Sequence, residues 1–250
     1  TFSGCSLNKV ISSPEIEECS FGDVNANEAI VLYGDSHATI LFNQLDTKLK
    51  EKKIKGLFLK NDNCKRFYNN DCVKSLNQIK SHLNKFNVKQ IIFSFRWPMR
   101  IQENFIFNVN SRKYMKPSNA QNELNNKYLS NFFQVFETFG EKVIIILSYP
   151  EYYDPKIINQ KNILFDNIED IYFKSEIYYD TFEFYNKLIK DIAFTYNYKL
   201  FNPSDIFCNT YKDNHCLVQK EYELFYSDTN HLSNKGAKMV IESLFLKFKL

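Results

Sequence analysis

Two short segments at opposite ends of the chain contain the residue types of a serine nucleophile and its base. Ser36 directly follows an apolar run, and Asp228 and His231 lie close together before the last helical pattern. A serine hydroxyl becomes a nucleophile when an imidazole accepts its proton, and a carboxylate orients that imidazole. The Asp-x-x-His spacing alone is common by chance, but its combination with Gly34-Asp35-Ser36 is strong evidence for a serine nucleophile with a base.

Each of these residues also has a purely structural interpretation. Serine is a preferred N-cap, so Ser36 could simply begin a helix. Asp228 could cap a turn, and His231 could be an ordinary loop histidine. The presence of both segments in one chain is what favours the catalytic interpretation.

The elements that must position these residues follow from the apolar pattern. Strand-like runs alternate with segments of helical spacing, which indicates βαβ units and one α/β domain with a parallel sheet covered on both faces. The expected strands are 29–33, 54–59, 88–95, 142–148 and 198–201, and the expected helices are 37–52, 73–86, 124–139, 180–197 and 234–248. Ligands of such sheets bind beyond the carboxyl ends of the strands. The segments at that edge are Asp35-Ser36, 61–63, Arg96-Trp97 and 227–231.

The remaining segments show no clear period. We expect residues 1–28 to form an irregular, disulfide-bearing lead-in to a catalytic domain of residues 29–250. Residues 99–118 are predicted to be a lid or substrate loop, and residues 151–175 an insertion. The chain begins at Thr1, as expected of a mature form or of a piece of a longer protein.

The composition of the 250 residues argues against two classes of protein. Lys+Arg is 32 against Asp+Glu 29, a formal net charge of +3, which disfavours a dedicated nucleic-acid binder. No apolar stretch approaches the roughly 18 residues of a membrane span. The aromatic share of 16% accompanies abundant Asn, Lys and Ile, as A/T-rich codons would produce, so it does not by itself indicate a sugar-binding surface.

Six cysteines fall into three local pairs: Cys5 and Cys19, Cys64 and Cys72, Cys208 and Cys216. None is a Cys-x-x-Cys pair and the histidines lack zinc-finger spacing, so no metal site is expected. The sequence cannot select among the many possible disulfide patterns, and six free thiols are the alternative. Pairing within each local pair is favoured because each brackets a polar loop, and it would indicate an oxidising compartment.

Two blocks of sequence resemble the SGNH hydrolase superfamily. Residues 30–38, Ile-Val-Leu-Tyr-Gly-Asp-Ser-His-Ala, resemble its nucleophile block, and residues 227–233, Ser-Asp-Thr-Asn-His-Leu-Ser, followed by Gly236-Ala237, resemble its Asp-x-x-His block. Three features point to one branch of this superfamily. They are the Gly-Asp-Ser-His-Ala form, the His-Leu-Ser ending and the Cys208 to Cys216 loop that precedes it. They resemble the SGNH domain attached to acyltransferase-3 membrane proteins, which O-acetylate surface glycans.

The resemblance implies the SGNH hydrolase fold, a flavodoxin-like three-layer α/β/α sandwich with a five-stranded parallel sheet. It implies Ser36 as the nucleophile, His231 as the general base and Asp228 as the carboxylate that orients the base. The chain departs from the superfamily where a glycine is expected near Asn61 and an asparagine near Arg96. The Ser36 amide is expected to remain an oxyanion donor, with a backbone amide near Asn61 and the Arg96 side chain as further donors.

Other residues near this edge have several open interpretations. Arg96 could equally form a structural ion pair, and Trp97 is expected in the core or a pocket wall rather than as a platform for a sugar. We expect His37 to pack or to support the site from behind. His82 and His215 receive no role.

The resemblance implies transfer of an acetyl group, through an acyl-serine, to a hydroxyl of a bacterial surface carbohydrate such as lipopolysaccharide, capsule or peptidoglycan. The domain would be extracytoplasmic, in the periplasm or at the cell surface, and tethered to the inner membrane by an N-terminal transmembrane acyltransferase-3 domain. That partner domain would supply acetyl groups from acetyl-CoA, and this domain would bind no cofactor and no nucleic acid. Two alternatives stay open: a free-standing carbohydrate O-acetylesterase, and a non-catalytic glycan-binding domain that keeps the fold.

Overall fold

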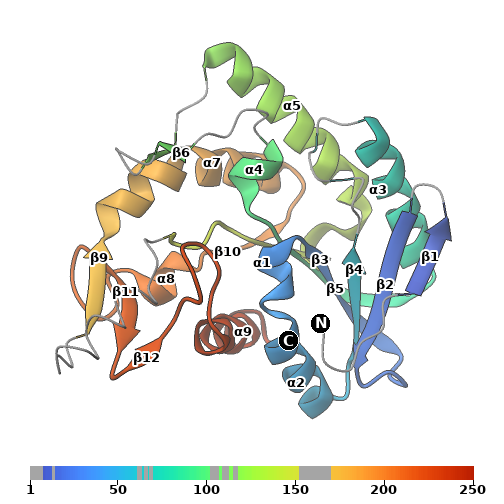
Figure 1. Ribbon diagram of the computed structural model, residues 1–250. Coiled ribbons are helices and arrows are strands. Elements are labelled where there is room, and N and C mark those ends of the chain that lie inside the picture. Colours follow the sequence, from blue (N-terminus) through green and yellow to red (C-terminus); the bar gives the residue numbers. More distant parts are fainter. Residues whose placement is uncertain are drawn as a thin grey trace.

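A seven-stranded sheet with helices on both faces forms the centre of the computed structural model (Figure 1), which describes residues 8–12, 15–60, 64, 67, 70–101, 107–108, 113–114, 118–151 and 170–250. Its strand order is β1-β2-β4-β3-β5-β8-β10. The parallel strands are β3 (Glu28–Gly34), β4 (Lys55–Lys60), β5 (Asn87–Ser94), β8 (Val143–Ile146) and β10 (Lys199–Phe201). Numbered along the chain, these five run in the order 2-1-3-4-5, which is the flavodoxin-like order. The predicted fold class is confirmed.

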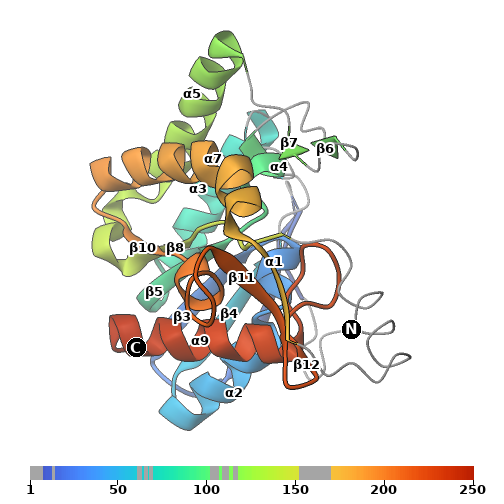
Figure 2. The same cartoon turned by 90° about the vertical axis from the view of Figure 1, so that its left-hand side faces the viewer.

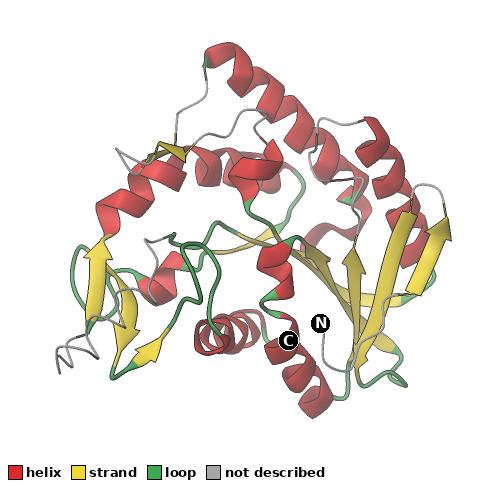
Figure 3. Cartoon of the chain, viewed as in Figure 1, coloured by secondary structure: helices red, strands yellow, loops and turns green. Residues whose placement is uncertain are grey.

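The helices divide into two layers, as Figure 3 shows. Their bounds are α1 (Ser36–Thr39), α2 (Phe42–Lys52), α3 (Asn70–Leu83), α4 (Trp97–Ile101), α5 (Asn119–Val135), α7 (Ser175–Thr195), α8 (Ser204–Phe207) and α9 (Asn234–Phe248), with a 3-10 helix, η2, at Glu137–Lys142. One apolar cluster joins the sheet to α1, α2 and α9, and the other joins it to α3 and α5. The first half of α7 packs into the former cluster and its second half into the latter.

The side chains of β3 show how the sheet separates these two clusters. Ile30 and Leu32 belong to the cluster with α2 and α9, whereas Val31 and Tyr33 belong to the cluster with α3 and α5. All four are at most 2% exposed. A strand buried on both faces needs apolar residues at every position, which is why the sequence reads here as an unbroken apolar run.

The first part of the chain corrects one expectation. Within the predicted irregular lead-in of residues 1–28, the structure has β1 (Asn8–Ser12) and β2 (Glu15–Gly22), and β2 pairs antiparallel with β4. Ile16, Cys19 and Phe21 of β2 are buried among half-buried polar residues. The sequence analysis missed this strand because it lacks a continuous apolar run: Ile16 packs into one apolar cluster and Cys19 and Phe21 into the other, with half-buried polar residues between them.

Smaller differences concern the connections. The helix predicted at 37–52 divides into α1 and α2, and the predicted loop 99–118 begins inside α4 and includes the short pair β6 (Phe107–Asn108) and β7 (Lys113–Tyr114). Most of the predicted insertion at 151–175 lies outside the described residues. Its end forms β9 (Ile171–Lys174), which makes a second sheet with β11 (His215–Lys220) and β12 (Glu223–Leu224) in the order β12-β11-β9.

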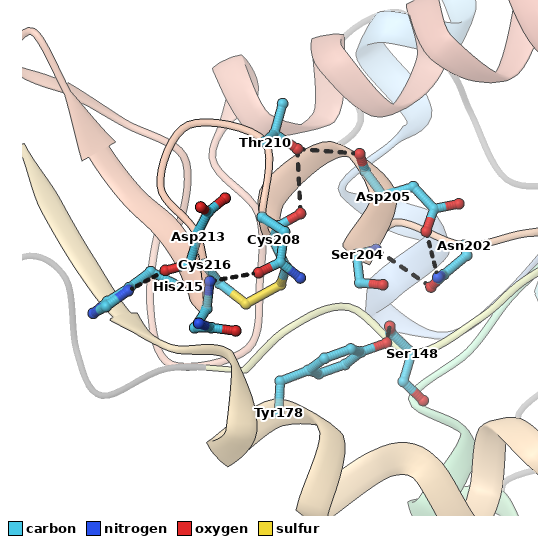
Figure 4. Close-up of a disulfide and its surroundings, with 12 residues drawn as sticks. Ser148, Tyr178, Asn202, Ser204, Asp205, Cys208, Thr210, Asp213, His215 and Cys216 are labelled. Atoms are coloured by element: carbon cyan, nitrogen blue, oxygen red, sulfur yellow. Dashed lines mark hydrogen bonds between the residues drawn. A yellow bond between two sulfur atoms is a disulfide. The ribbon is translucent and has the colours of Figure 1, made fainter.

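Disulfides confirm two of the three predicted cysteine pairs. Cys64 is bonded to Cys72 and Cys208 to Cys216, and Figure 4 shows the latter bond between α8 and β11. Cys19 is disulfide-bonded as well, and its predicted partner, Cys5, lies outside the described residues. In the part of the chain that the structure describes, no helix is both long and apolar enough to cross a membrane.

Candidate active site

Ser36 lies at the carboxyl edge of the sheet, in the sharp turn between β3 and α1. Gly34 makes this turn possible: a Cβ atom there would lie only 1.9 Å from the backbone oxygen of Ser94 on β5. Asp35 is the N-cap of α1, and its Oδ1 accepts a hydrogen bond of 2.9 Å from the N–H of His37. The turn leaves the Ser36 side chain exposed to solvent. The N–H of Ser36 is in the first helical turn, where the helix itself offers no acceptor.

Asp228 and His231 lie in the loop between β12 and α9. The carboxylate of Asp228 holds this loop in shape, because its Oδ1 accepts the backbone N–H groups of Asn230 at 2.9 Å and of His231 at 2.8 Å. At the base of the loop the N–H of Ser227 donates to the backbone oxygen of His231 at 2.9 Å. Ser233 then caps α9 by accepting the N–H of Gly236.

The two segments meet at a single imidazole. His231 Nε2 lies 2.7 Å from Ser36 Oγ, and His231 Nδ1 lies 2.7 Å from Asp228 Oδ2. With a proton on Nδ1, the imidazole donates to Asp228 and can accept the Ser36 hydroxyl proton at Nε2. Partial burial acts to raise the pKa of Asp228, but the N–H groups of Asn230 and His231 and the imidazole outweigh it and lower that pKa. Asp228 is therefore ionised near neutral pH, as an orienting carboxylate must be.

The carboxylate of Asp35 ties the Ser36 turn to the segment after β5. It accepts the backbone N–H of Arg96, at 3.0 Å to Oδ2, and the Nε of Arg100 at 2.8 Å, besides the N–H of His37. Burial acts to raise the pKa of Asp35, but the Arg100 guanidinium and the hydrogen bond from the His37 N–H help to lower it overall. Arg100 was not predicted as part of the site. Its spacing of four residues from Arg96, one helical turn away, was the available signal.

The Arg96 side chain forms a two-point ion pair with Glu151. Its Nε lies 2.8 Å from Oε1 and its Nη2 lies 2.7 Å from Oε2. Of the two predicted roles for Arg96, this geometry matches the structural ion pair, and its backbone N–H adds the bond to Asp35. Glu151 follows directly on Tyr149-Pro150 after β8, and the sequence analysis did not single it out.

Trp97 is a core residue. It is fully buried, its indole Nε1 donates to the backbone oxygen of Ile146 at 2.7 Å, and its ring contacts Phe95 and Phe133. A sugar cannot stack on a ring with no exposed surface. Asn61, the other predicted oxyanion position, lies outside the described residues.

His37 is buried next to the loop that contains Asp228 and His231. It is 1% exposed, its Nε2 is 3.5 Å from Asn230 Nδ2, and its ring packs against the rings of Tyr149 and His231 at 5.1 and 5.5 Å. Burial lowers the pKa of His37 to about 3, so the imidazole is neutral. Because the His37 ring is uncharged, it does not repel a positive charge that forms on His231.

No group of three or more potential metal-ligating side chains is present in the described parts of the chain. The other histidines lie apart from Ser36: His82 contacts Glu18 at 2.7 Å, and His215 contacts the backbone oxygen of Asp213. The arrangement at Ser36 therefore consists of a hydroxyl, an imidazole and a carboxylate in hydrogen-bond contact, the groups that a serine nucleophile with a base would require.

Comparison with known proteins points to one family. The model of the SGNH domain that is fused to AT3 domains matches residues 4–244. A search of curated proteins found no match.

Among solved structures, the periplasmic domain of a lipopolysaccharide acetyltransferase from Salmonella ser. Paratyphi A is similar at a TM-score of 0.60. The two are 16% identical, and the match covers 92% of this chain and 87% of that chain. A putative hydrolase from Rickettsia typhi matches at a TM-score of 0.27 and 10% identity, over 83% of this chain and 65% of that chain. The first of these likenesses supports the fold, and the second is too distant to support an argument.

Proposed function

We propose, from the premise that this chain belongs to the family of SGNH domains fused to AT3 domains, that it is a serine acyltransferase domain acting on carbohydrate outside the cytoplasm. The observation that carries the proposal is the imidazole of His231, which lies 2.7 Å from Ser36 Oγ and 2.7 Å from Asp228 Oδ2. The substrate class is proposed from the Salmonella domain of similar fold, which belongs to a lipopolysaccharide acetyltransferase.

The first half of the reaction forms an acyl-serine. Ser36 Oγ attacks the carbonyl carbon of an acetyl donor while His231 Nε2 takes its proton, and Asp228 stabilises the resulting imidazolium. The negative charge on the carbonyl oxygen needs N–H donors, and the Ser36 amide at the start of α1 is positioned to be one. Collapse of this intermediate releases the donor's leaving group, which takes the proton from His231.

The second half repeats these steps with an alcohol. A sugar hydroxyl gives its proton to His231 and attacks the acetyl carbonyl, and Ser36 Oγ leaves with the proton. We propose acetyl-CoA as the ultimate donor, through an AT3 partner domain, and no cofactor bound by this chain. The disulfides Cys64–Cys72 and Cys208–Cys216 support placement in an oxidising compartment, the periplasm or the cell surface.

An esterase uses the same acyl-serine with water as the acceptor. This second candidate is favoured by one observation, the exposure of the site: the Asp228 side chain is 48% exposed and that of His231 is 25% exposed. Water can therefore reach the acyl-serine unless an acceptor or a partner covers it.

The decisive experiment compares the full-length protein with its Ser36→Ala variant in cells. The parent should acetylate the surface polysaccharide, measured by NMR of the purified glycan, and the variant should not. Acetylation that persists in Ser36→Ala cells would contradict both catalytic functions and favour a binding role. A parent that releases acetate from acetylated glycan and never adds it would identify the esterase.

A further inference from the structure

A cavity of about 500 Å³ lies between the start of α7 and the loop that the Cys208–Cys216 disulfide closes. Glu176, Tyr179 and Asp180 line it from α7, and Asn209, Asn214 and His215 line it from the loop. Figure 2 shows the start of α7 next to β9 and β11. Among the described residues, the lining includes none of Ser36, Asp228 and His231. The cavity is therefore a second site and not part of the first.

The loop wall of this cavity is fixed by several bonds. Beside the disulfide, Asn214 N–H donates to Asn209 Oδ1 at 2.7 Å, and Asn209 N–H donates to the backbone oxygen of His215 at 2.8 Å. The N–H of Ser175 at the start of α7 donates to the backbone oxygen of Asn214 at 3.0 Å, which joins the two walls. Figure 4 shows the same loop held from α8, where Thr210 Oγ1 donates to the backbone oxygens of Asp205 and Cys208. The cavity is therefore formed before any ligand arrives.

The lining matches the chemistry of a sugar. Tyr179 is 39% exposed, and its ring lies 5.2 Å from the buried ring of Tyr178 with the two planes tilted by 57°, so the cavity is lined by one partly exposed aromatic ring. Asparagine amides and an imidazole both donate and accept hydrogen bonds, as sugar hydroxyls do. Carboxylates such as Glu176 accept from sugar hydroxyls. Apart from Tyr179 the described lining is polar, which suits the many hydroxyl groups of a sugar.

Other ligand classes fit less well. Lys174 is the one cation among the described lining residues, against the carboxylates of Glu176 and Asp180, which disfavours phosphate and other anions. A metal ion is disfavoured because the described residues include no group of three or more side chains suited to hold one.

We propose that this cavity binds a segment of a carbohydrate chain. The β11 strand that begins in the cavity wall continues through β12 into residues 225–232, so the binding wall and the loop of Asp228 and His231 are consecutive in the chain. The cavity would hold one part of the acceptor glycan and so limit which of its residues can reach Ser36. For the identity of the glycan, this inference rests on the proposed function.

Binding of polysaccharide to the full-length protein tests the inference. The probe is surface polysaccharide from the producing bacterium, freed of O-acetyl groups with mild alkali, and calorimetry measures its affinity without any acyl donor. Tyr179→Ala should weaken binding about tenfold, because the stacking face is lost. Tyr179→Phe, which keeps the ring, should retain most of the affinity.

Phe194→Ala is the matched control, because Phe194 is an 88% exposed aromatic residue near the other end of α7 and outside the cavity. It should bind as the parent does. Unfolding temperatures verify that each variant is folded, and Glu176→Gln, expected to weaken binding severalfold, replaces Tyr179→Ala should that variant not fold.

Parent affinity in folded Tyr179→Ala, or no polysaccharide binding by the parent, would overturn the inference. Tyr179-dependent binding in a protein that never transfers acetyl groups would support the inference while contradicting the proposed function. Acetyl transfer with the same KM for polysaccharide in the parent and in Tyr179→Ala would support the proposed function and contradict this inference.

Discussion

The two segments that meet at Ser36 are held in place in different ways. The Ser36 turn depends on residues distant in sequence: Asp35 is bonded to Arg96 and Arg100, some 60 residues further along the chain. The loop of Asp228 and His231 depends mostly on itself, since Asp228 accepts two N–H groups from its own loop. The carboxylate of Asp35 is 8% exposed, whereas that of Asp228 is 48% exposed.

Because of this difference, substitutions near Asp35 and substitutions at Asp228 should affect different properties of the protein. A buried ion pair that loses one partner leaves a desolvated charge behind, so changes around Asp35 should act first on stability. An exposed carboxylate can be replaced with little effect on folding, so changes at Asp228 should act first on the rate. Three experiments examine this contrast.

The largest effect is expected from Asp228→Asn. An asparagine can keep the loop bonds but favours the wrong tautomer of His231, and comparable changes in serine enzymes lower kcat by about 10⁴-fold. Steady-state hydrolysis of p-nitrophenyl acetate measures the rate, and thermal unfolding should show a nearly unchanged Tm. A large fall in Tm with a modest fall in rate would contradict the contrast.

An intermediate effect is expected from Arg100→Met. The variant leaves the Asp35 carboxylate buried without its cation, and we expect the free energy of unfolding to fall by about 2–3 kcal/mol in urea titrations. Lys48→Met is the control, because the Lys48–Glu51 pair is exposed and should contribute about 0.5 kcal/mol or less. Equal losses in the two variants would show that Asp35 needs no buried partner.

The smallest effect is expected in the acid dependence of stability. Because the pKa of Asp35 is lowered on folding, its contribution is complete above its ordinary pKa of 3.8 and is lost as the pH falls through the lower folded-state value. Asp35→Asn should therefore flatten the decline of unfolding free energy between about pH 5 and pH 2. Asp228→Asn should flatten it less, since solvent screens that carboxylate more. A steeper decline in Asp35→Asn than in the parent would contradict the assigned sign.

The sequence predicted the fold well where a run of apolar residues has a single structural explanation. Apolar runs predicted the central parallel strands β3, β5 and β8, because strands buried on both faces need apolar residues at most positions. The alternation with helical segments also placed β4 and the half-exposed β10. The juxtaposition of Ser36 with His231 also followed, because parallel strands place their carboxyl ends at one edge. Their catalytic role stays a proposal.

The sequence predicted less for charged residues, which can lie in solvent, form an ion pair or bind a ligand. The sequence left two roles open for Arg96 and did not single out Arg100 or Glu151. The structure places Arg100 Nε 2.8 Å from Asp35 Oδ2 and Arg96 Nη2 2.7 Å from Glu151 Oε2. Such ion pairs depend on a few ångströms of backbone placement, which local patterns do not determine. The half-polar β2 was missed for a related reason, since its burial comes from neighbours that are distant in sequence.

The antiparallel strand β2 also affects how the protein behaves toward other copies of itself. From Glu17 opposite Lys60 to Gly22 opposite Lys55, it occupies the outer hydrogen-bonding row of β4, a strand whose middle residues are all buried. A polypeptide cut to begin at β3 would expose that row as a flat apolar edge, the kind of surface on which chains stack into aggregates. We therefore expect the shortest form of this domain that stays monomeric to include the N-terminal strands.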